Sequence, residues 1–289
     1  MSLKNSLKLV LVLAVSVLVF HYGTMIFSPS GARASADGSY MLSKEKLTLP
    51  NGLTAVVAEK HKLPLVYIQL LVRAGALHEP REKAGLSNLT GRLLDKGTSS
   101  KTAFEIAEGL DLIGASLSVN PGKSATTISL SVLKKDLEEA LRIFRELLID
   151  PAFREEEVER EKKKVLSEIV QKKDSPRSIV QDAMLETIYR EHAMGKPTEG
   201  YEDTVTGITA EDIWDFYRRH YLPNTSILVM VADMSREGMR DVVQRYFGSA
   251  RNGWKKGGTI IDVQQPGKGL KKFRQKWQAR RTGFLGMVS

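Results

Sequence analysis

The 289 residues of this chain include 5 histidines and no cysteine. Only histidines and carboxylates could therefore hold a metal ion or activate a water molecule. The histidines are His21, His61, His78, His192 and His220. No two of them are four residues apart, so no helix can present two imidazoles one turn apart on the same face. The lack of cysteine excludes a thiolate nucleophile, a thiolate metal ligand and a disulfide. We expect His78 and His192 to lie on loops and not in a ligand cluster.

Motifs for other chemistries are also missing. No Gly-x-Ser-x-Gly elbow positions a serine nucleophile, and no Gly-x-x-x-x-Gly-Lys loop is present to bind phosphate. Carboxylates are instead concentrated in a charged stretch at 154–173, which the residue pattern predicts to be helical. The local sequence therefore identifies no catalytic centre.

The formal net charge of +9 is carried by the two ends of the chain. Residues 251–289 hold ten Lys or Arg and one Asp, a net of +9, and the first 34 residues add +3. Subtracting both ends from the total leaves −3 for residues 35–250. The basic tail shows no nucleic-acid recognition fold, so we expect no nucleic-acid partner. We expect residues 251–289 to be a basic tail that is either poorly ordered or truncated.

Residues 1–36 have the order of a secretory signal. Lys4 and Lys8 precede an apolar run from Leu9 to Phe20, and small residues follow near Ala34 and Ala36. A retained membrane anchor is the alternative, although the run is short against the roughly 20 residues of a spanning helix. We therefore expect an exported protein, periplasmic or extracellular, which meets a membrane only through this segment if it is not cleaved.

The remaining pattern predicts one α+β domain at 41–250. Strands are predicted at 45–49, 54–59, 65–72, 115–119, 126–133 and 226–231, and helices at 84–94, 103–113, 137–149, 154–173, 178–189, 210–220 and 236–246. Turns are expected at Asn51-Gly52 and at Asn120-Pro121-Gly122. The order of these elements favours an antiparallel sheet with helices packed on one face.

Several short stretches, in this order and spacing, resemble the first half-domain of the M16 zinc metallopeptidases, the insulinase, pitrilysin and processing-peptidase family. They are Leu49-Pro50-Asn51-Gly52-Leu53, Gly85-Leu86 with Lys96-Gly97-Thr98, Pro151-Ala152-Phe153 and Tyr221-Leu222-Pro223-Asn224. The resemblance runs from about Met41 to Phe247. It implies the M16 half-domain fold, and members of the family usually carry two such half-domains.

The resemblance also implies a zinc helix written His-x-x-Glu-His, with a distant glutamate as third ligand. In this chain the corresponding positions are Asn88, Gly91 and Arg92. The neutral amide of Asn88 and the permanent positive charge of Arg92 cannot replace the two zinc-binding imidazoles. Gly91 has no side chain that could act as the base. We therefore expect no catalytic residues, no bound metal and no cofactor in this chain, whereas the family uses zinc.

The distant carboxylate survives at the spacing that the family implies. Glu168 occupies the third-ligand position, and Glu161, two turns earlier on the same face, matches a supporting carboxylate. The alternative is that both are ordinary carboxylates of a charged helix. We predict an ion pair between Arg92 and Glu168; the alternative is that Glu168 pairs with Lys164 or Lys172 on its own helix.

The peptide-binding edge strand of the family corresponds to Ala115, Ser116, Leu117, Ser118 and Val119. Strand addition uses backbone hydrogen bonds, so it can outlast a lost metal site. An edge that is covered by the chain's own loops or by a partner is the open alternative.

The resemblance implies three functions. The leading one is a non-catalytic subunit that binds peptide or pairs with a catalytic M16 chain, as in two-component M16 peptidases. The alternatives are a stand-alone peptide-binding or assembly protein, and a truncated fragment of a two-domain zinc metalloendopeptidase. A zinc peptidase with an unusual site is disfavoured because positions 88 and 92 lack histidine. We expect the chain to be inactive in proteolysis on its own.

Overall fold

The computed structural model describes residues 43–190, 192–248, 254, 256 and 257. The predicted signal at 1–36 and most of the predicted tail at 251–289 lie outside these residues. No helix within the described ranges is long and apolar enough to cross a membrane.

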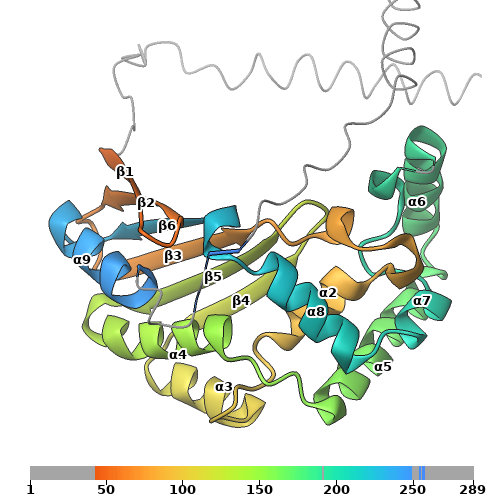
Figure 1. The fold of residues 1–289 in the computed structure, drawn as a ribbon, viewed down its shortest axis with the longest axis horizontal. Helices are drawn as coiled ribbons and strands as arrows, with labels where there is room; N and C mark the ends of the chain where they lie inside the picture. The colour runs from red at the N-terminus through yellow and green to blue at the C-terminus, as the bar shows by residue number, and fades with distance from the viewer. Residues whose placement is uncertain (1–42, 191, 249–253, 255, 258–289) are drawn as a thin grey trace, which may run out of the picture. The chain divides into compact units, whose positions relative to one another are not determined.

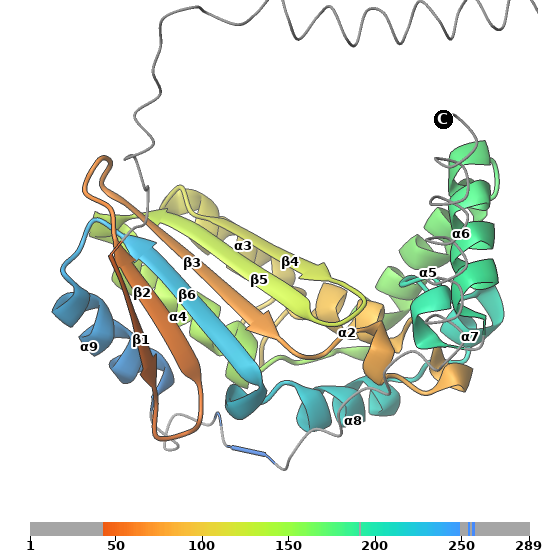
Figure 2. The ribbon, with the colours of Figure 1, turned by 90° about the horizontal axis from the view of Figure 1, so that it is seen from above.

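The described chain is built on one six-stranded sheet with the order β1-β2-β6-β3-β5-β4 (Figures 1 and 2). The strands are β1 (Lys44–Thr48), β2 (Thr54–Glu59), β3 (Leu65–Val72), β4 (Ser116–Pro121), β5 (Thr126–Leu133) and β6 (Ser226–Ala232). Four of the neighbouring pairs are antiparallel, and the pair of β2 with β6 is parallel. The hairpin of β1 and β2 therefore joins the rest of the sheet through β6, the last strand in the sequence.

Alternation along the strands separates a buried face from an open one. In β3, Val66, Ile68 and Leu70 are at most 1% exposed, while Tyr67 and Leu71 on the opposite face are 41% and 37% exposed. Buried and exposed residues alternate along a strand when one face of its sheet is covered and the other is open to solvent.

Helices cover the buried face and gather beyond one end of the strands. The helices are α2 (Leu86–Leu93), α3 (Ala103–Leu112), α4 (Leu137–Ile149), α5 (Glu155–Lys172), α6 (Pro176–Tyr189), α7 (Glu202–Thr206), α8 (Ala210–His220) and α9 (Arg236–Phe247). In Figure 2, α3, α4 and α9 lie behind the sheet, whereas α2 lies beside the end of β4 with α5 and α8 close by. The expected fold, a sheet with helices packed on one face, is confirmed, with one parallel strand pair within it.

Helix ends follow the local sequence. Thr209 caps α8 by accepting a hydrogen bond from the backbone N–H of Asp212 at 3.2 Å, as its position before the helix predicts. In α6, Ser175 caps the helix and Pro176 occupies its first turn, so the helix begins two residues before the predicted start at 178.

The predicted turn at Asn120-Pro121-Gly122 is wrong. Asn120 and Pro121 continue β4, and the turn lies between Gly122 and Ala125, where the Gly122 N–H donates to the Ala125 carbonyl at 2.9 Å. Proline is tolerated here because β4 is an edge strand and the missing N–H of Pro121 would point away from β5.

Candidate functional site

Helix α2 carries the residues that correspond to the zinc motif, and its position is fixed at its N-terminus by Glu79. The Glu79 carboxylate accepts hydrogen bonds from the backbone N–H groups of Gly85 at 3.0 Å and Ser87 at 2.8 Å. Gly85 precedes the helix with a φ of 97°, a conformation that favours glycine. Burial raises the pKa of Glu79 to about 7, against the opposing effect of the two backbone hydrogen bonds.

The structure places Arg92 of α2 on Glu168 of α5. Its Nη1 and Nη2 donate to the two carboxylate oxygens at 2.8 and 2.7 Å, the parallel geometry that guanidinium and carboxylate favour. Arg92 Nε also lies 3.4 Å from Glu161 Oε2. The predicted ion pair is therefore present, and Arg92 joins both carboxylates singled out in the sequence.

The two carboxylates differ in burial. The Glu161 side chain is 2% exposed and that of Glu168 is 47% exposed. Burial alone would raise the pKa of Glu161, but the nearby charges of Lys164, Lys96 and Arg92 hold it below its ordinary value. Glu161, and not Glu168, is thus the buried anion that Arg92 helps to neutralise.

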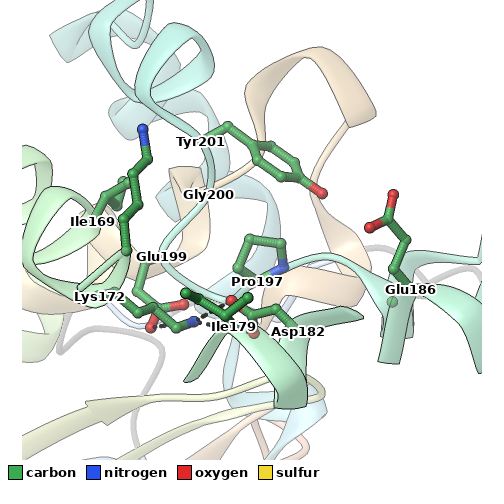
Figure 3. Close-up of a pocket in the computed structure, with 11 residues that line it drawn as sticks. Ile169, Lys172, Ile179, Asp182, Glu186, Pro197, Glu199, Gly200 and Tyr201 are labelled. Carbon is green, nitrogen blue, oxygen red and sulfur yellow. Dashed lines mark hydrogen bonds and ion pairs between the residues drawn. The ribbon is translucent and has the colours of Figure 1, made fainter. Parts of the chain in front are cut away.

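The lysines proposed as alternative partners of Glu168 lie elsewhere. Lys164 pairs with Glu161. Lys172 Nζ lies 2.9 Å from Asp182 and 3.4 Å from Glu199, inside a pocket of about 190 Å³ that α5, α6 and the 195–201 loop enclose (Figure 3). Figure 3 shows that Lys172 points between these two acids. The alternative pairing of Glu168 is therefore not formed.

Gly91 is in contact with the end of β4. A Cβ atom added at Gly91 would lie 2.5 Å from Cγ and 3.2 Å from Cβ of Pro121. Real Cβ atoms do not approach a ring carbon this closely, so a side chain at this helix position, where the family has its base, would require Pro121 or the helix to shift. The sequence did not reveal this contact, which joins residues 30 positions apart.

The donor set does not fit zinc. Asn88 is 7% exposed and offers a neutral amide, Gly91 offers no ligand, and the Arg92 guanidinium lies where a second imidazole would be needed. Within the described ranges, no three His, Asp or Glu side chains gather closely enough to hold a metal ion. No hydrolytic step can be derived from these residues.

Two of the histidines, His78 and His220, form a pair in the described structure. His78 is in a 3-10 helix (Ala76–His78), and its ring centroid lies 5.5 Å from that of His220 at the end of α8. Burial, and then the charge of His78, lower the pKa of His220 to about 4, so its imidazole is neutral near pH 7. This pair was missed because the two residues are far apart in the sequence and share no motif.

The predicted peptide-binding strand, β4, is an edge of the sheet, and its pairing with β5 shows which of its backbone groups are free. Along an antiparallel pair of strands, residues whose N–H and C=O groups bond to the neighbouring strand alternate with residues whose groups point away from it. Since Gly122 is bonded to Ala125, the backbone groups of Leu117, Val119 and Pro121 point away from β5. Pro121 has no N–H, which leaves the outward N–H groups of Leu117 and Val119.

The N–H of Ala115 is already used, because it donates to the Leu110 carbonyl of α3 at 2.9 Å. Of the five predicted residues, Ser116 and Ser118 bond toward β5 and expose their side chains, while Leu117 and Val119 pack half-buried against the core. The open part of the edge is therefore short, and it ends beside α2 (Figure 2).

We expect Gly91→Ala to destabilise the protein, although alanine favours helices over glycine by about 1 kcal/mol. The added Cβ meets the rigid Pro121 ring, and overpacking of this kind costs about 1–3 kcal/mol. Urea unfolding measures the change.

The matched control is Gly109→Ala in α3, where the only close atom is the mobile Cδ1 of Ile143 at 3.2 Å. This variant should be neutral or stabilised. Combining Gly91→Ala with Pro121→Ala should recover part of the loss. A Gly91→Ala protein as stable as the unaltered chain would mean that the two residues do not press on each other.

Comparisons with known proteins agree with this fold. The family model described as insulinase, peptidase family M16, matches residues 54–202, and the model described as the peptidase M16 inactive domain matches residues 207–281. The second match extends beyond Phe247, where the resemblance by short motifs ends.

Curated relatives include an uncharacterized zinc protease of Rickettsia felis, 28% identical over 72% of this chain and 50% of its own, and the uncharacterized zinc protease YmxG of Bacillus subtilis, 27% identical over 84% and 59%. The chain thus spans about half the length of these relatives.

Among solved structures, an M16 inactive domain from Pseudomonas fluorescens superposes with a TM-score of 0.74 at 22% identity, over 78% of this chain and 54% of that one. The periplasmic protease PqqL of Escherichia coli superposes with a TM-score of 0.68 at 18% identity, over 76% and 25%. These likenesses concern the fold. With the first family model covering more than half of the sequence, the chain belongs to peptidase family M16.

Proposed function

We propose that this chain is a non-catalytic M16 subunit that holds an extended peptide along β4 and works beside a catalytic M16 chain. The observation that carries the proposal is the replacement of the metal site by the Arg92–Glu168 and Arg92–Glu161 contacts beside an open strand edge. The guanidinium occupies the region between α2 and α5 that a metal would need. Catalysis must then come from another chain.

Support for peptide binding comes from the free backbone groups of β4. The outward N–H groups of Leu117 and Val119 can donate to the carbonyls of an added strand, and their own carbonyls can accept from it. The exposed side chains of Ser116 and Ser118 leave one side of that edge polar and unobstructed. Strand addition needs no metal, so it is compatible with the remodelled helix.

Support for a catalytic partner comes from the names of the relatives. Curated relatives are named zinc proteases, whereas the residues at the motif positions of this chain do not fit zinc. A second M16 unit that carries the zinc motif would supply the chemistry that these positions lack. Export, as the 1–36 segment suggests, would place both in the same compartment as the periplasmic protease PqqL, which shares the fold.

The proposal predicts that Val119→Pro weakens peptide binding at least tenfold, because it removes one of the two outward N–H groups without disturbing the bonds of β4 to β5. Fluorescence anisotropy with a labelled unstructured peptide of about ten residues measures the affinity.

The matched control is Val119→Ala, which shortens the same side chain and keeps the N–H group. It should bind within a few-fold of the unaltered chain. Equal affinities for Val119→Pro and Val119→Ala would reject strand addition at this edge.

The purified chain should contain no stoichiometric zinc and should not cleave the same peptide, because no described residue replaces the base at position 91. Elemental analysis after dialysis and a chelator-controlled cleavage assay test this. About one zinc per chain, or chelator-sensitive cleavage, would contradict the proposal. Cleavage that arises only after a zinc-bearing M16 chain is added would agree with it.

A further inference from the structure

The open face of the sheet is a broad surface that no helix of the described chain covers (Figure 2). Every second residue of each strand belongs to it, and the pairing of the strands arranges these residues in rows that cross the sheet. One row, from β1 to β4, consists of Lys46, Val56, Val229, Gln69, Ser129 and Ser118. The face therefore has a defined order of side chains from one edge of the sheet to the other.

The middle of this face, on β3 and β6, is apolar. Tyr67, Leu71 and Ile227 are large side chains that remain exposed there, and Leu65 and Leu133 extend the patch along the strands. Leu71 and Ile227 are direct neighbours across the pair of β3 with β6. Contiguous exposed apolar side chains on one surface indicate a contact with another molecule, and tyrosine is enriched at the centre of such contacts.

The two borders of the face carry opposite hydrogen-bonding character. β1 presents Lys44 and Lys46, which are the only charged side chains that the six described strands place on this face. β4, at the other border, presents the neutral oxygens of Ser116, Ser118 and Asn120. An ammonium group only donates hydrogen bonds, whereas hydroxyl and carbonyl oxygens accept them. The face is thus complementary to itself when its borders are exchanged.

We propose that the open face binds the open face of a second copy of this chain, with a two-fold axis that runs parallel to the strands, midway between β3 and β6. This axis places β6 opposite β3 and β1 opposite β4 of the other copy. Ile227 then faces the partner's Leu71, and Lys46 faces the partner's Ser118. The inference goes beyond the proposed function and does not rest on it, because strand addition at β4 extends the sheet in its own plane and leaves its face free.

The lysines decide between the two possible axes. A symmetric contact of two identical surfaces requires a two-fold axis, which lies either along the strands or across them. An axis across the strands would place Lys46 opposite the partner's Lys46, and like charges that face each other oppose association. The axis along the strands separates the lysines of the two copies and pairs each with a neutral acceptor.

The size of the face is sufficient for a dimer. Six strands about 4.8 Å apart and about six residues long at ~3.3 Å per residue give a face of roughly 29 Å by 20 Å. This is roughly 600 Å² of flat area on each copy, and the accessible area of a pleated, side-chain-covered face is larger, which approaches the roughly 800 Å² per partner of a standard interface. A lipid surface fits less well, because serine, threonine and asparagine occupy the side of the face on β4 and β5.

Sedimentation velocity of the purified chain should show a monomer–dimer equilibrium with a Kd on the order of micromolar. Leu71→Lys should weaken it at least a hundredfold, because the new charge loses water opposite the partner's Ile227 without gaining a counter-charge. Ile227→Lys tests the same contact from the neighbouring strand, independently of any effect of Leu71→Lys on folding. Leu112→Lys in α3 is the matched control, since Leu112 is 81% exposed on a helix behind the sheet, and it should leave the Kd unchanged.

Three results would overturn the proposal. The first is a monomer throughout the micromolar range. The second is a dimer that survives both Leu71→Lys and Ile227→Lys, which would identify another face or another kind of contact. The third is a dimer that is lost in Leu112→Lys as readily as in Leu71→Lys.

The axis is tested by an exchange of charge between the borders. Ser118→Lys should weaken the dimer about tenfold, because it places a second ammonium group opposite the partner's Lys46. Adding Lys46→Glu to Ser118→Lys should recover the original Kd to within a few-fold. Within one copy the two positions are about 24 Å apart, on opposite edges of the sheet, so they cannot pair there. An axis across the strands would instead bring like charges together at both borders, and a double variant that stays weak would reject the proposed arrangement.

Discussion

Arg92→Met is expected to lower the free energy of unfolding by about 3 kcal/mol. The substitution leaves Glu161, 2% exposed, with Lys164 as its one remaining close ion pair, and removal of one partner of a buried pair costs on the order of 3–5 kcal/mol. We choose the lower end because Lys164 remains. Urea unfolding at neutral pH measures the effect.

Double-mutant cycles identify which carboxylate matters. Arg92 with Glu161→Gln should show a coupling well above 1 kcal/mol, whereas Arg92 with Glu168→Gln should show roughly 0.2–1 kcal/mol, because the Glu168 side chain is 47% exposed. Arg142→Met, which breaks an exposed pair with Glu139 in α4, is the matched control and should have almost no effect. A larger coupling to Glu168 than to Glu161 would contradict this assignment.

Glu79→Gln should flatten the pH dependence of stability. Burial raises the pKa of Glu79 from 4.5 to about 7, so the folded state binds the proton more tightly than the unfolded state does. The stabilisation from this group is fully present below pH 4.5 and is lost as the pH rises through about 7. The stability difference between the unaltered chain and Glu79→Gln should therefore fall by on the order of 3 kcal/mol over that window.

The effect is measured as the difference in stability between the two proteins at each pH, because carboxylates with a lowered pKa change stability with pH in the opposite direction. Glu161 has a lowered pKa, and its contribution is lost as the pH falls below about 4.5. Glu82→Gln, at an exposed position of the 3-10 helix Arg81–Lys83, is the control. Parallel profiles for Glu79→Gln and the unaltered chain would show that Glu79 keeps its ordinary pKa.

Most strands were predictable because each has one covered face. The bounds of β2, β3 and β5 agree to the residue with the alternation of apolar and polar side chains. The end of β4 was misplaced because Pro121 has the composition of a turn, and only the edge position of the strand allows it there. The parallel pairing of β2 with β6 joins strands about 170 residues apart, which local periodicity cannot encode.

The site was predictable in part. The spacing of Arg92 and Glu168 within the family resemblance anticipated their ion pair, but not that Glu161 would be the more buried partner. Burial depends on how α2, α5 and β4 pack together, and no residue pattern within one element determines it. The Gly91–Pro121 contact was missed for the same reason.

The contact between Gly91 and Pro121 also makes the loss of the motif hard to reverse by single substitutions. A glutamate acquired first at position 91 would press into the proline ring, and a change at Pro121 first would leave a gap beside a helix that still lacks its base. Arg92 would have to be given up as well, at the expense of Glu161. Each single step towards His-x-x-Glu-His therefore destabilises this fold before the complete motif is present.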